Sequence, residues 1–243
     1  MIRRKEVIGN QTLILGDCLE VMPTLGRFDA VVTDPPYGIR YSPGGGGGGI
    51  TDANGKRYVK RFTGRDVVIG DDRPFDPAPI LALGVPTMMW GANHYASRLP
   101  DMASWLVWDK RRGTLTNDFA DCEIAWSNLR TPARCLPHLW NGALRDSERA
   151  IPRVHATQKP VRVMEWCIGH LPKAAATILD PFMGSGTTLV ACARMGLKGI
   201  GIEIDPDHFE IACRRVEEAC RQPDFFVQPP APAPEQAKLW SEE

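Results

Sequence analysis

Apolar residues in this chain gather in short runs of four that contain few polar positions. Such runs are typical of strands that are covered on both faces, because neither face has to meet water. The runs predict seven strands, at Thr12–Leu15, Ala30–Thr33, Thr87–Trp90, Trp105–Trp108, Glu123–Trp126, Ala176–Leu179 and Gly199–Ile202.

Helical patterns separate several of these strands. The clearest is Pro206–Arg221, where Asp205 can cap the first turn, Pro206 suits the first helical position, and Phe209 and Val216 share one face. Weaker patterns predict helices at Pro77–Leu83, Ala92–Arg98, Pro160–His170 and Thr187–Met195. Strands that alternate with helices predict an α/β fold with a doubly wound, mainly parallel sheet.

Two segments interrupt this alternation. Residues 41–67 contain six consecutive glycines, followed by a basic stretch that includes five Lys or Arg residues and only two Asp residues. The backbone freedom of glycine predicts a mobile, basic flap here. Residues 225–243 are rich in proline and predict an extended tail, so residues 1–224 are expected to form the folded domain.

Charge and cysteine content say little about the function of the protein and more about the cellular compartment in which it is expected. The 243 residues include 29 Lys and Arg and 29 Asp and Glu, so the net charge favours no class of partner. No run of about 18 apolar residues predicts a membrane helix, and the first residues lack the apolar core of a secretory signal. Seven cysteines without a C-x-x-C pair are typical of free thiols in the cytoplasm, and they argue against a disulfide framework or a metal site.

One predicted strand ends in an unusual corner. After Ala30–Thr33 the chain continues as Asp34-Pro35-Pro36-Tyr37. A simple turn needs no acid, and two prolines remove two backbone donors while they stiffen the chain. We therefore interpret the carboxylate, the carbonyl groups and the aromatic ring of this corner as groups that contact a ligand.

A second corner has the pattern of a nucleoside site. The sequence from Ile178 to Gly196 reads as a strand, a glycine-containing turn and a helix, so that free N–H groups and a close backbone approach are available to a ligand. Glu203 ends a further strand 17 residues after Gly186, where an acid can bind ribose hydroxyls. Leu189 takes the place of the third glycine of the dinucleotide fingerprint, which argues against an ordinary NAD site.

Three motifs in this order make a family resemblance. Asp34–Tyr37, the "HATQKP" stretch His155–Pro160 and the "DPFMGSGTT" stretch Asp180–Thr188 closely resemble the β-class DNA amino-methyltransferases of the adenine-N6 type. The resemblance extends over Thr12–Arg221 and departs from the family at Ala156, where proline is usual. It implies a seven-stranded, Rossmann-like methyltransferase sheet that is circularly permuted, with the catalytic strand before the cofactor strand.

The resemblance also assigns roles to residues of the two corners. The family transfers a methyl group from S-adenosylmethionine to an exocyclic nitrogen of a base that is flipped out of DNA. By analogy, Asp34 and the Pro35 carbonyl accept hydrogen bonds from the amino group, Pro36 stiffens the corner, and Tyr37 stacks on the base. The cofactor residues that it implies are Asp17, Thr157, Lys159, Asp180, Phe182, Gly184, Ser185, Gly186, Thr187 and Glu203.

Contacts with DNA are expected from the two least regular parts of the chain. The basic flap supplies cations that phosphates attract, and residues 129–154 form a short, arginine-rich target-recognition segment. The predicted DNA-binding residues are Lys56, Arg57, Lys60, Arg61, Arg65, Arg130 and Arg134. Trp140 and Asn141 either face DNA or pack inside the protein. So short a recognition segment would gain reach from a second subunit, and relatives are often dimers, which suggests a homodimer.

Several alternatives stay open on the sequence. An acid at the first position of the Asp34 corner is typical of adenine-N6 enzymes, whereas cytosine-N4 enzymes usually have serine there. Cytosine-N4 methylation in the same fold is therefore the first alternative. A DNA-binding relative that has lost catalysis is the second, and the intact motifs argue against it. A nucleotide-dependent oxidoreductase is disfavoured by Leu189 and by the lack of residues suited to hydride transfer.

Overall fold

The computed structural model describes residues 1–40, 50–51, 57–58, 68–112, 120–141, 144–149 and 158–221. The predicted tail at 225–243 lies outside the described residues, as does most of the predicted flap at 41–67.

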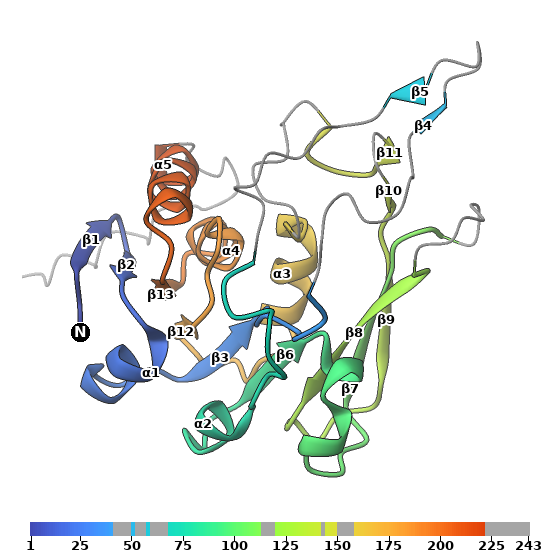
Figure 1. Ribbon diagram of the computed structural model, residues 1–243, viewed down its shortest axis with the longest axis horizontal. Coiled ribbons are helices and arrows are strands. Elements are labelled where there is room, and N and C mark those ends of the chain that lie inside the picture. The colour runs from blue at the N-terminus through green and yellow to red at the C-terminus, as the bar shows by residue number, and fades with distance from the viewer. Residues whose placement is uncertain are drawn as a thin grey trace, which may run out of the picture.

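A single large sheet organises the described part of the chain (Figure 1). Its strand order is β1-β2-β13-β12-β3-β6-β8-β7-β9. The strands are β1 (Arg4–Ile8), β2 (Gln11–Leu15), β3 (Ala30–Thr33), β6 (Thr87–Trp90), β7 (Trp105–Asp109), β8 (Cys122–Ser127), β9 (Arg134–Pro137), β12 (Thr177–Asp180) and β13 (Lys198–Glu203). All seven predicted strands are present, and most of their residues are buried, as continuous apolar runs require.

Over the residues that the structure describes, the sheet has nine strands rather than the expected seven. The two additional strands, β1 and β9, form its edges, where β1 pairs antiparallel with β2 and β9 pairs parallel with β7. Both are largely exposed. Their sequences, RKEVI and RCLP, therefore mix charged and apolar residues and lack the run that identified the buried strands.

The pairing of the strands brings the functional corners together. Strands β2, β13, β12, β3 and β6 are mutually parallel, whereas β8 runs antiparallel between β6 and β7. The carboxyl ends of the parallel strands and the beginning of β8 consequently lie along the same side of the sheet, which we call the catalytic edge to distinguish it from the edge strands β1 and β9. The chain builds β3 and β6 before it adds β12 and β13 beside β3, which is the permuted order that the sequence implied.

Helices cover both faces of the sheet (Figure 1). One face carries α3 (Val161–Ile168), α4 (Thr187–Arg194) and α5 (Pro206–Arg221), and the other carries α1 (Cys18–Val21) and α2 (Ala78–Leu81). In the described part of the chain, two small strand pairs stand outside the main sheet: β4 (Ile50–Thr51) with β5 (Arg57–Tyr58), and β10 (Trp140–Asn141) with β11 (Leu144–Arg145).

The predicted helix at Ala92–Arg98 is wrong. The segment forms two 3-10 turns, Ala92–His94 and Ala96–Arg98, which meet at Tyr95. Tyr95 has a φ of −134°, outside the helical region, and its hydroxyl donates a hydrogen bond to the carbonyl of Trp90. Its ring packs against Phe75 at a centroid distance of 4.9 Å, and burial of this ring takes precedence over a regular helix.

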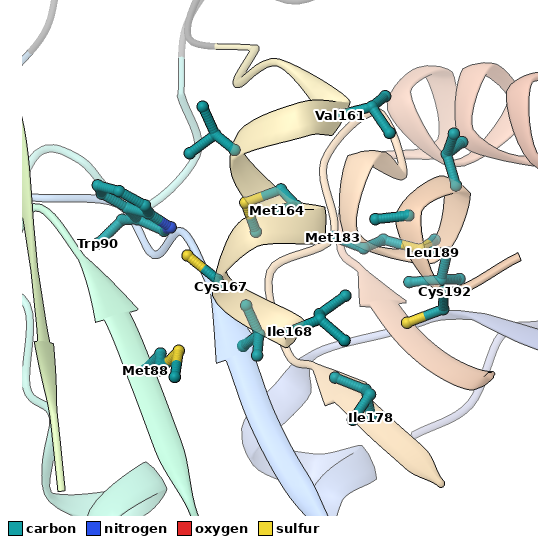
Figure 2. Close-up of a cluster of buried hydrophobic side chains, with 14 of the residues drawn as sticks. Met88, Trp90, Val161, Met164, Cys167, Ile168, Ile178, Met183, Leu189 and Cys192 are labelled. Atoms are coloured by element: carbon teal, nitrogen blue, oxygen red, sulfur yellow. The ribbon is translucent and has the colours of Figure 1, made fainter. Parts of the chain in front are cut away.

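The core beneath α3, α4 and α5 explains the departure at Leu189. Figure 2 shows Met88 and Trp90 of β6 directed towards α3, and Leu189 of α4 within the same apolar cluster. A Cβ atom at Gly201 of β13 would lie 2.8 Å from Leu189 Cδ1. The close approach of helix and strand is thus provided by a glycine on the strand, so the helix can carry a large side chain.

Two simpler expectations can be compared with the described residues. Each of the seven cysteines is a free thiol, as predicted. Within the residues that the structure describes, no helix is both long and apolar enough to cross a membrane.

Candidate active site

The Asp34 corner forms a compact hydrogen-bonded group at the end of β3. Asp34 Oδ1 accepts a hydrogen bond from the Tyr37 hydroxyl at 2.6 Å, and Asp34 Oδ2 lies 2.5 Å from Lys159 Nζ. Lys159 also donates to the Tyr37 oxygen at 2.9 Å. Pro35 is buried and Pro36 half-buried, so the corner is held from both sides by the fold.

The ring of Tyr37 is held in one position by its neighbours. It stacks on the His94 ring with a centroid distance of 5.1 Å and an interplanar angle of 16°. Its edge lies directly over Gly91, where an added Cβ would be 2.0 Å from the ring carbon Cε1. Gly91 also has a φ of 69°, in the left-handed region that favours glycine. The residue after β6 is therefore fixed as glycine by both its conformation and its neighbour.

The structure places Lys159 at the Asp34 corner, although the resemblance suggested a cofactor contact for it. Lys159 is almost fully buried and lies 3.1 Å from Glu123 Oε2 as well as beside Asp34. Burial acts to lower the pKa of Lys159, but the two carboxylates outweigh it and raise the pKa, so the side chain stays an ammonium. Glu123 was not identified as a site residue from the sequence.

Asp180 stabilises the glycine-containing turn from within. Its carboxylate accepts hydrogen bonds from Thr33 Oγ1 at 2.6 Å, from Thr188 Oγ1 at 2.5 Å and from the Phe182 amide at 3.1 Å. Burial raises the pKa of Asp180 to about 6. Because Thr33 directly precedes Asp34, this contact joins the two corners. The described contacts of Asp180 thus give it a positioning role.

Glu203 reaches back to the same turn. Its two oxygens accept hydrogen bonds from the Gly184 and Asp205 amides, each at 2.8 Å. Gly184 and Gly186 have φ values of 51° and 80°, which bend the chain sharply before α4. Phe182, within the turn, packs edge-on against Phe75 at 5.7 Å.

Arg215 of α5 fixes the turn from outside, a contact that no sequence motif indicated. Its guanidinium donates to Ser185 O at 2.6 Å, to Ser185 Oγ at 2.8 Å and to Thr187 Oγ1 at 3.2 Å. It also lies 3.8 Å from Glu148, which accepts a hydrogen bond from the Val161 amide at the start of α3. Glu148 thereby links the predicted recognition segment to both the turn and the residues after Lys159.

Asp17 lies at the same edge of the sheet as Glu203. The residue before it, Gly16, donates its amide to the carbonyl of Glu203 at 2.8 Å, which places the ends of β2 and β13 side by side. Asp17 caps α1 by accepting a hydrogen bond from the Leu19 amide at 2.8 Å. Thr157, the remaining predicted cofactor residue, lies outside the described residues.

The predicted DNA-binding residues are described only in part. Arg130 and Arg134 are exposed. Of the flap residues, Arg57 lies in β5 with its side chain undescribed, and the residues outside the described ranges are Lys56, Lys60, Arg61 and Arg65. Trp140 is buried, with His138 stacked on it and the Arg145 guanidinium 4.7 Å from its ring centroid. Trp140 therefore packs inside the protein, and nothing is described for the side chain of Asn141.

Glu203, the acid of the second corner, should make the free energy of unfolding depend on pH. Burial raises the pKa of Glu203 from its ordinary value of 4.5 to about 7. A pKa raised by folding means that the native state binds the extra proton, so this stabilisation is full below pH 4.5 and is lost as pH rises through 7. We expect the free energy of unfolding to fall over this interval more steeply in the wild type than in Glu203→Gln, whose amide does not titrate. Denaturant titrations across the interval measure it, and equal slopes would contradict it.

Solved structures share this fold. The M1.HpyAVI–SAM complex aligns with a TM-score of 0.51 at 20% identity, over 85% of this chain and 98% of that chain. The cytosine-N4-specific PvuII DNA methyltransferase aligns with a TM-score of 0.57 at 14% identity, over 88% of this chain and 90% of that chain. At such identities the likeness concerns the fold alone. It shows that the sheet has the Rossmann-like fold of these two structures, as the sequence predicted.

Sequence relatives point to the same group of proteins. The Type II methyltransferase M2.DpnII of Streptococcus pneumoniae is 39% identical over 79 residues, 32% of this chain and 30% of the relative. The Type II methyltransferase M.ScaI of Streptomyces caespitosus is 40% identical over 82 residues, 33% of this chain and 26% of the relative. The matched region spans less than a third of each relative's length. The sequence pattern of the N6/N4-type DNA methylases matches residues 87–214, more than half of the chain, and the chain belongs to this family.

Proposed function

We propose that this protein transfers a methyl group from S-adenosylmethionine to N6 of an adenine that has been flipped out of DNA. The observation that carries the proposal is the adjacency of the two corners. Asp34 follows β3, Asp180 ends β12, and these strands are neighbours in the sheet, with Thr33 bonded to Asp180 at 2.6 Å. A target base at the first corner and a nucleoside cofactor at the second would therefore lie beside each other.

The first corner suits the chemistry of an amino nitrogen. The lone pair of an exocyclic amino group is delocalised into the ring, so the nitrogen is a poor nucleophile. The Asp34 carboxylate and the Pro35 carbonyl can each accept one N–H of that group, which favours a pyramidal nitrogen whose lone pair can attack. The two prolines limit the motion of this backbone, and holding reacting groups in line is itself a large part of catalysis.

Tyr37 provides the surface for the extruded base. Enzymes that modify a base take it out of the duplex and stack it on aromatic side chains. In the structure both oxygens of Asp34 already have donors, the Tyr37 hydroxyl and the Lys159 ammonium. An incoming amino group would replace the Tyr37 hydroxyl at Oδ1, so entry of the base and a shift of Tyr37 would occur together.

The second corner has the donors and acceptors that S-adenosylmethionine requires. The cofactor supplies an electrophilic methyl group. Glu203 can accept hydrogen bonds from ribose hydroxyls once it releases the Gly184 amide, and the Gly184–Gly186 turn leaves room for a ligand beside the backbone. Asp17 lies at the same edge and suits a contact with the adenine ring. Arg215 keeps the turn in place while these contacts form.

DNA contacts are expected from the basic flap. Replacing Lys56, Arg57, Lys60, Arg61 and Arg65 with neutral residues should weaken binding to every DNA sequence and should reduce the slope of affinity against salt, because fewer phosphate counterions are released. Cofactor affinity should not change. Titrations of a labelled duplex at several salt concentrations measure both quantities. A salt slope equal to that of the wild type would make the flap a simple connector.

Assembly and location complete the proposal. The recognition segment at 129–154 is short, so a homodimer would give the protein a longer contact with DNA, and free cysteines suit an enzyme that acts in the cytoplasm. Light scattering of the protein with and without a DNA duplex tests the dimer. A monomer under both conditions would rule it out.

Methylated nucleosides from cells test the function itself. The experiment uses a host that lacks its own adenine methylase. DNA from cells that express the wild type should then contain more N6-methyladenine than DNA from cells that express Asp34→Ala. N4-methylcytosine in its place would favour the alternative substrate, which the PvuII enzyme of the same fold modifies. Neither product, from a protein that binds the cofactor, would favour a DNA-binding role without catalysis.

A further inference from the structure

Three charged residues in addition to Asp34 meet at the first corner. Lys159 Nζ lies 2.5 Å from Asp34 Oδ2 and 3.1 Å from Glu123 Oε2. The other oxygen of Glu123 accepts a hydrogen bond from Lys110 Nζ at 3.0 Å. The order of contacts is therefore Asp34, Lys159, Glu123 and Lys110, with the buried Lys159 in the centre and Lys110 nearer to solvent.

The reversed strand β8 brings Glu123 to this place. Because β8 runs antiparallel to β6 and β7, its beginning lies at the edge where the parallel strands end. Glu123 is opposite Trp108 in the register of β7 and β8, and Lys110 follows the end of β7 directly. An acid at the start of this strand is thus delivered to the catalytic edge by the topology of the sheet.

The charge balance of the group gives Glu123 a function. Asp34 and Lys159 alone would form a neutral pair, and the ammonium would offset much of the negative potential at Asp34. With Glu123 as a second partner, Lys159 lies between two carboxylates, so its charge is shared and offsets less of the charge of Asp34, while Lys110, nearer to solvent, balances the far oxygen of Glu123. In the proposed reaction the amino nitrogen gains positive charge as the methyl group is transferred, and preorganised negative charge stabilises that change.

We propose that Glu123 is a positioning residue for methyl transfer, which holds the Lys159 ammonium between two carboxylates and so leaves the charge of Asp34 available to the target amino group. This inference rests on the proposed function. Glu123 acts through Lys159 and does not itself contact the base.

The pKa directions within the group agree with this geometry. Burial acts to raise the pKa of Glu123, but Lys159 and Lys110 outweigh it and lower the pKa to about 2, so Glu123 is ionised at neutral pH. The pKa of Asp34 is raised by burial and further by Glu123, against the effect of Lys159. Among the described residues, the other ionisable groups that interact with Asp34 are Tyr37, Tyr95 and Asp180.

Glu123→Gln tests the inference, because it keeps the shape and hydrogen-bonding capacity of the side chain and removes its charge. We expect the single-turnover rate of methyl transfer to fall about tenfold, less than for loss of a group that touches the reacting atoms. Affinities for DNA and cofactor should stay at the wild-type values. Glu123→Asp should recover part of the rate. The control is Asp121→Asn, which removes a neighbouring exposed acid that pairs with Arg111 instead of Lys159.

A titration of the protein without DNA or cofactor separates this inference from the proposed function. Carboxyl ¹³C NMR, with the Asp34 signal assigned from its loss in Asp34→Asn, should show Asp34 titrating at lower pH in Glu123→Gln than in the wild type. The sign follows because Glu123 raises the pKa of Asp34. The acid limb of the rate profile should move in the same direction. An unchanged Asp34 titration would overturn the inference, whatever the activity of the wild type, and an inactive wild type with the expected titration would overturn only the proposed function.

Discussion

Asp34→Ala is expected to lower the single-turnover rate of methyl transfer by about 10²–10³-fold, the loss typical of removing one preorganised group that stabilises a transition state. In the proposed reaction, the contact between Asp34 and the amino group matters chiefly when positive charge develops on the nitrogen, so the loss should appear in the chemical step. Affinity for S-adenosylmethionine should be unchanged, because Glu203 and the Gly184–Gly186 turn are intact. Rapid-quench methyl transfer and calorimetry measure the two quantities.

Asp34→Asn is the matched variant for this test. It keeps an acceptor oxygen at the corner but removes the charge, so its rate should lie between those of the wild type and Asp34→Ala. A normal rate for Asp34→Ala would show that the corner does not act on the amino group. Equal rates for the two variants would show that the charge, rather than the acceptor, is what matters.

Gly91→Ala is expected to cause the other large loss. The new methyl group would lie 2.0 Å from Cε1 of Tyr37, so the ring must leave its stack on His94 and give up its hydrogen bond to Asp34. We expect methyl transfer to fall as much as in Tyr37→Ala, because base stacking on an aromatic ring contributes about 1–3 kcal/mol. Unfolding titrations and single-turnover rates on the same protein separate stability from activity.

Gly84→Ala provides the control for Gly91. Its φ of 66° is close to the 69° of Gly91, but an added Cβ there would meet nothing within 4 Å. Both variants should lose about 1–2 kcal/mol of stability from the left-handed backbone conformation. Only Gly91→Ala should lose further stability and activity. Equal effects of the two substitutions would mean that the position of Tyr37 is not critical.

The strands could be predicted where burial leaves a signal in the sequence. All seven runs that are apolar on both faces form strands of the sheet. The edge strands β1 and β9 leave no such signal, because exposed strands need no apolar run. The predicted helix at Ala92–Arg98 is wrong because Tyr95 leaves the helical conformation to bury its ring. The local pattern of apolar residues therefore predicts buried strands well. It does not predict exposed edge strands, or segments whose conformation is set by packing with distant residues.

The site shows the same division between local and distant causes. The Asp34 corner and the glycine-containing turn are continuous stretches of sequence, and both were predicted. Glu123 and Arg215 were not, since the first depends on the reversal of β8 and the second on the packing of α5 against the turn. Lys159 was recognised through its motif, but only the fold shows its contact with Asp34.

The measurement that tests the central claim most directly uses purified protein, S-adenosylmethionine with a deuterated methyl group, and DNA without prior methylation. After digestion to nucleosides, mass spectrometry should find the labelled methyl group on N6 of deoxyadenosine for the wild type, and almost none for Asp34→Ala at equal cofactor occupancy. Label on N4 of deoxycytidine, or no label on DNA while the cofactor is bound, would contradict the assignment of the Asp34 corner to adenine.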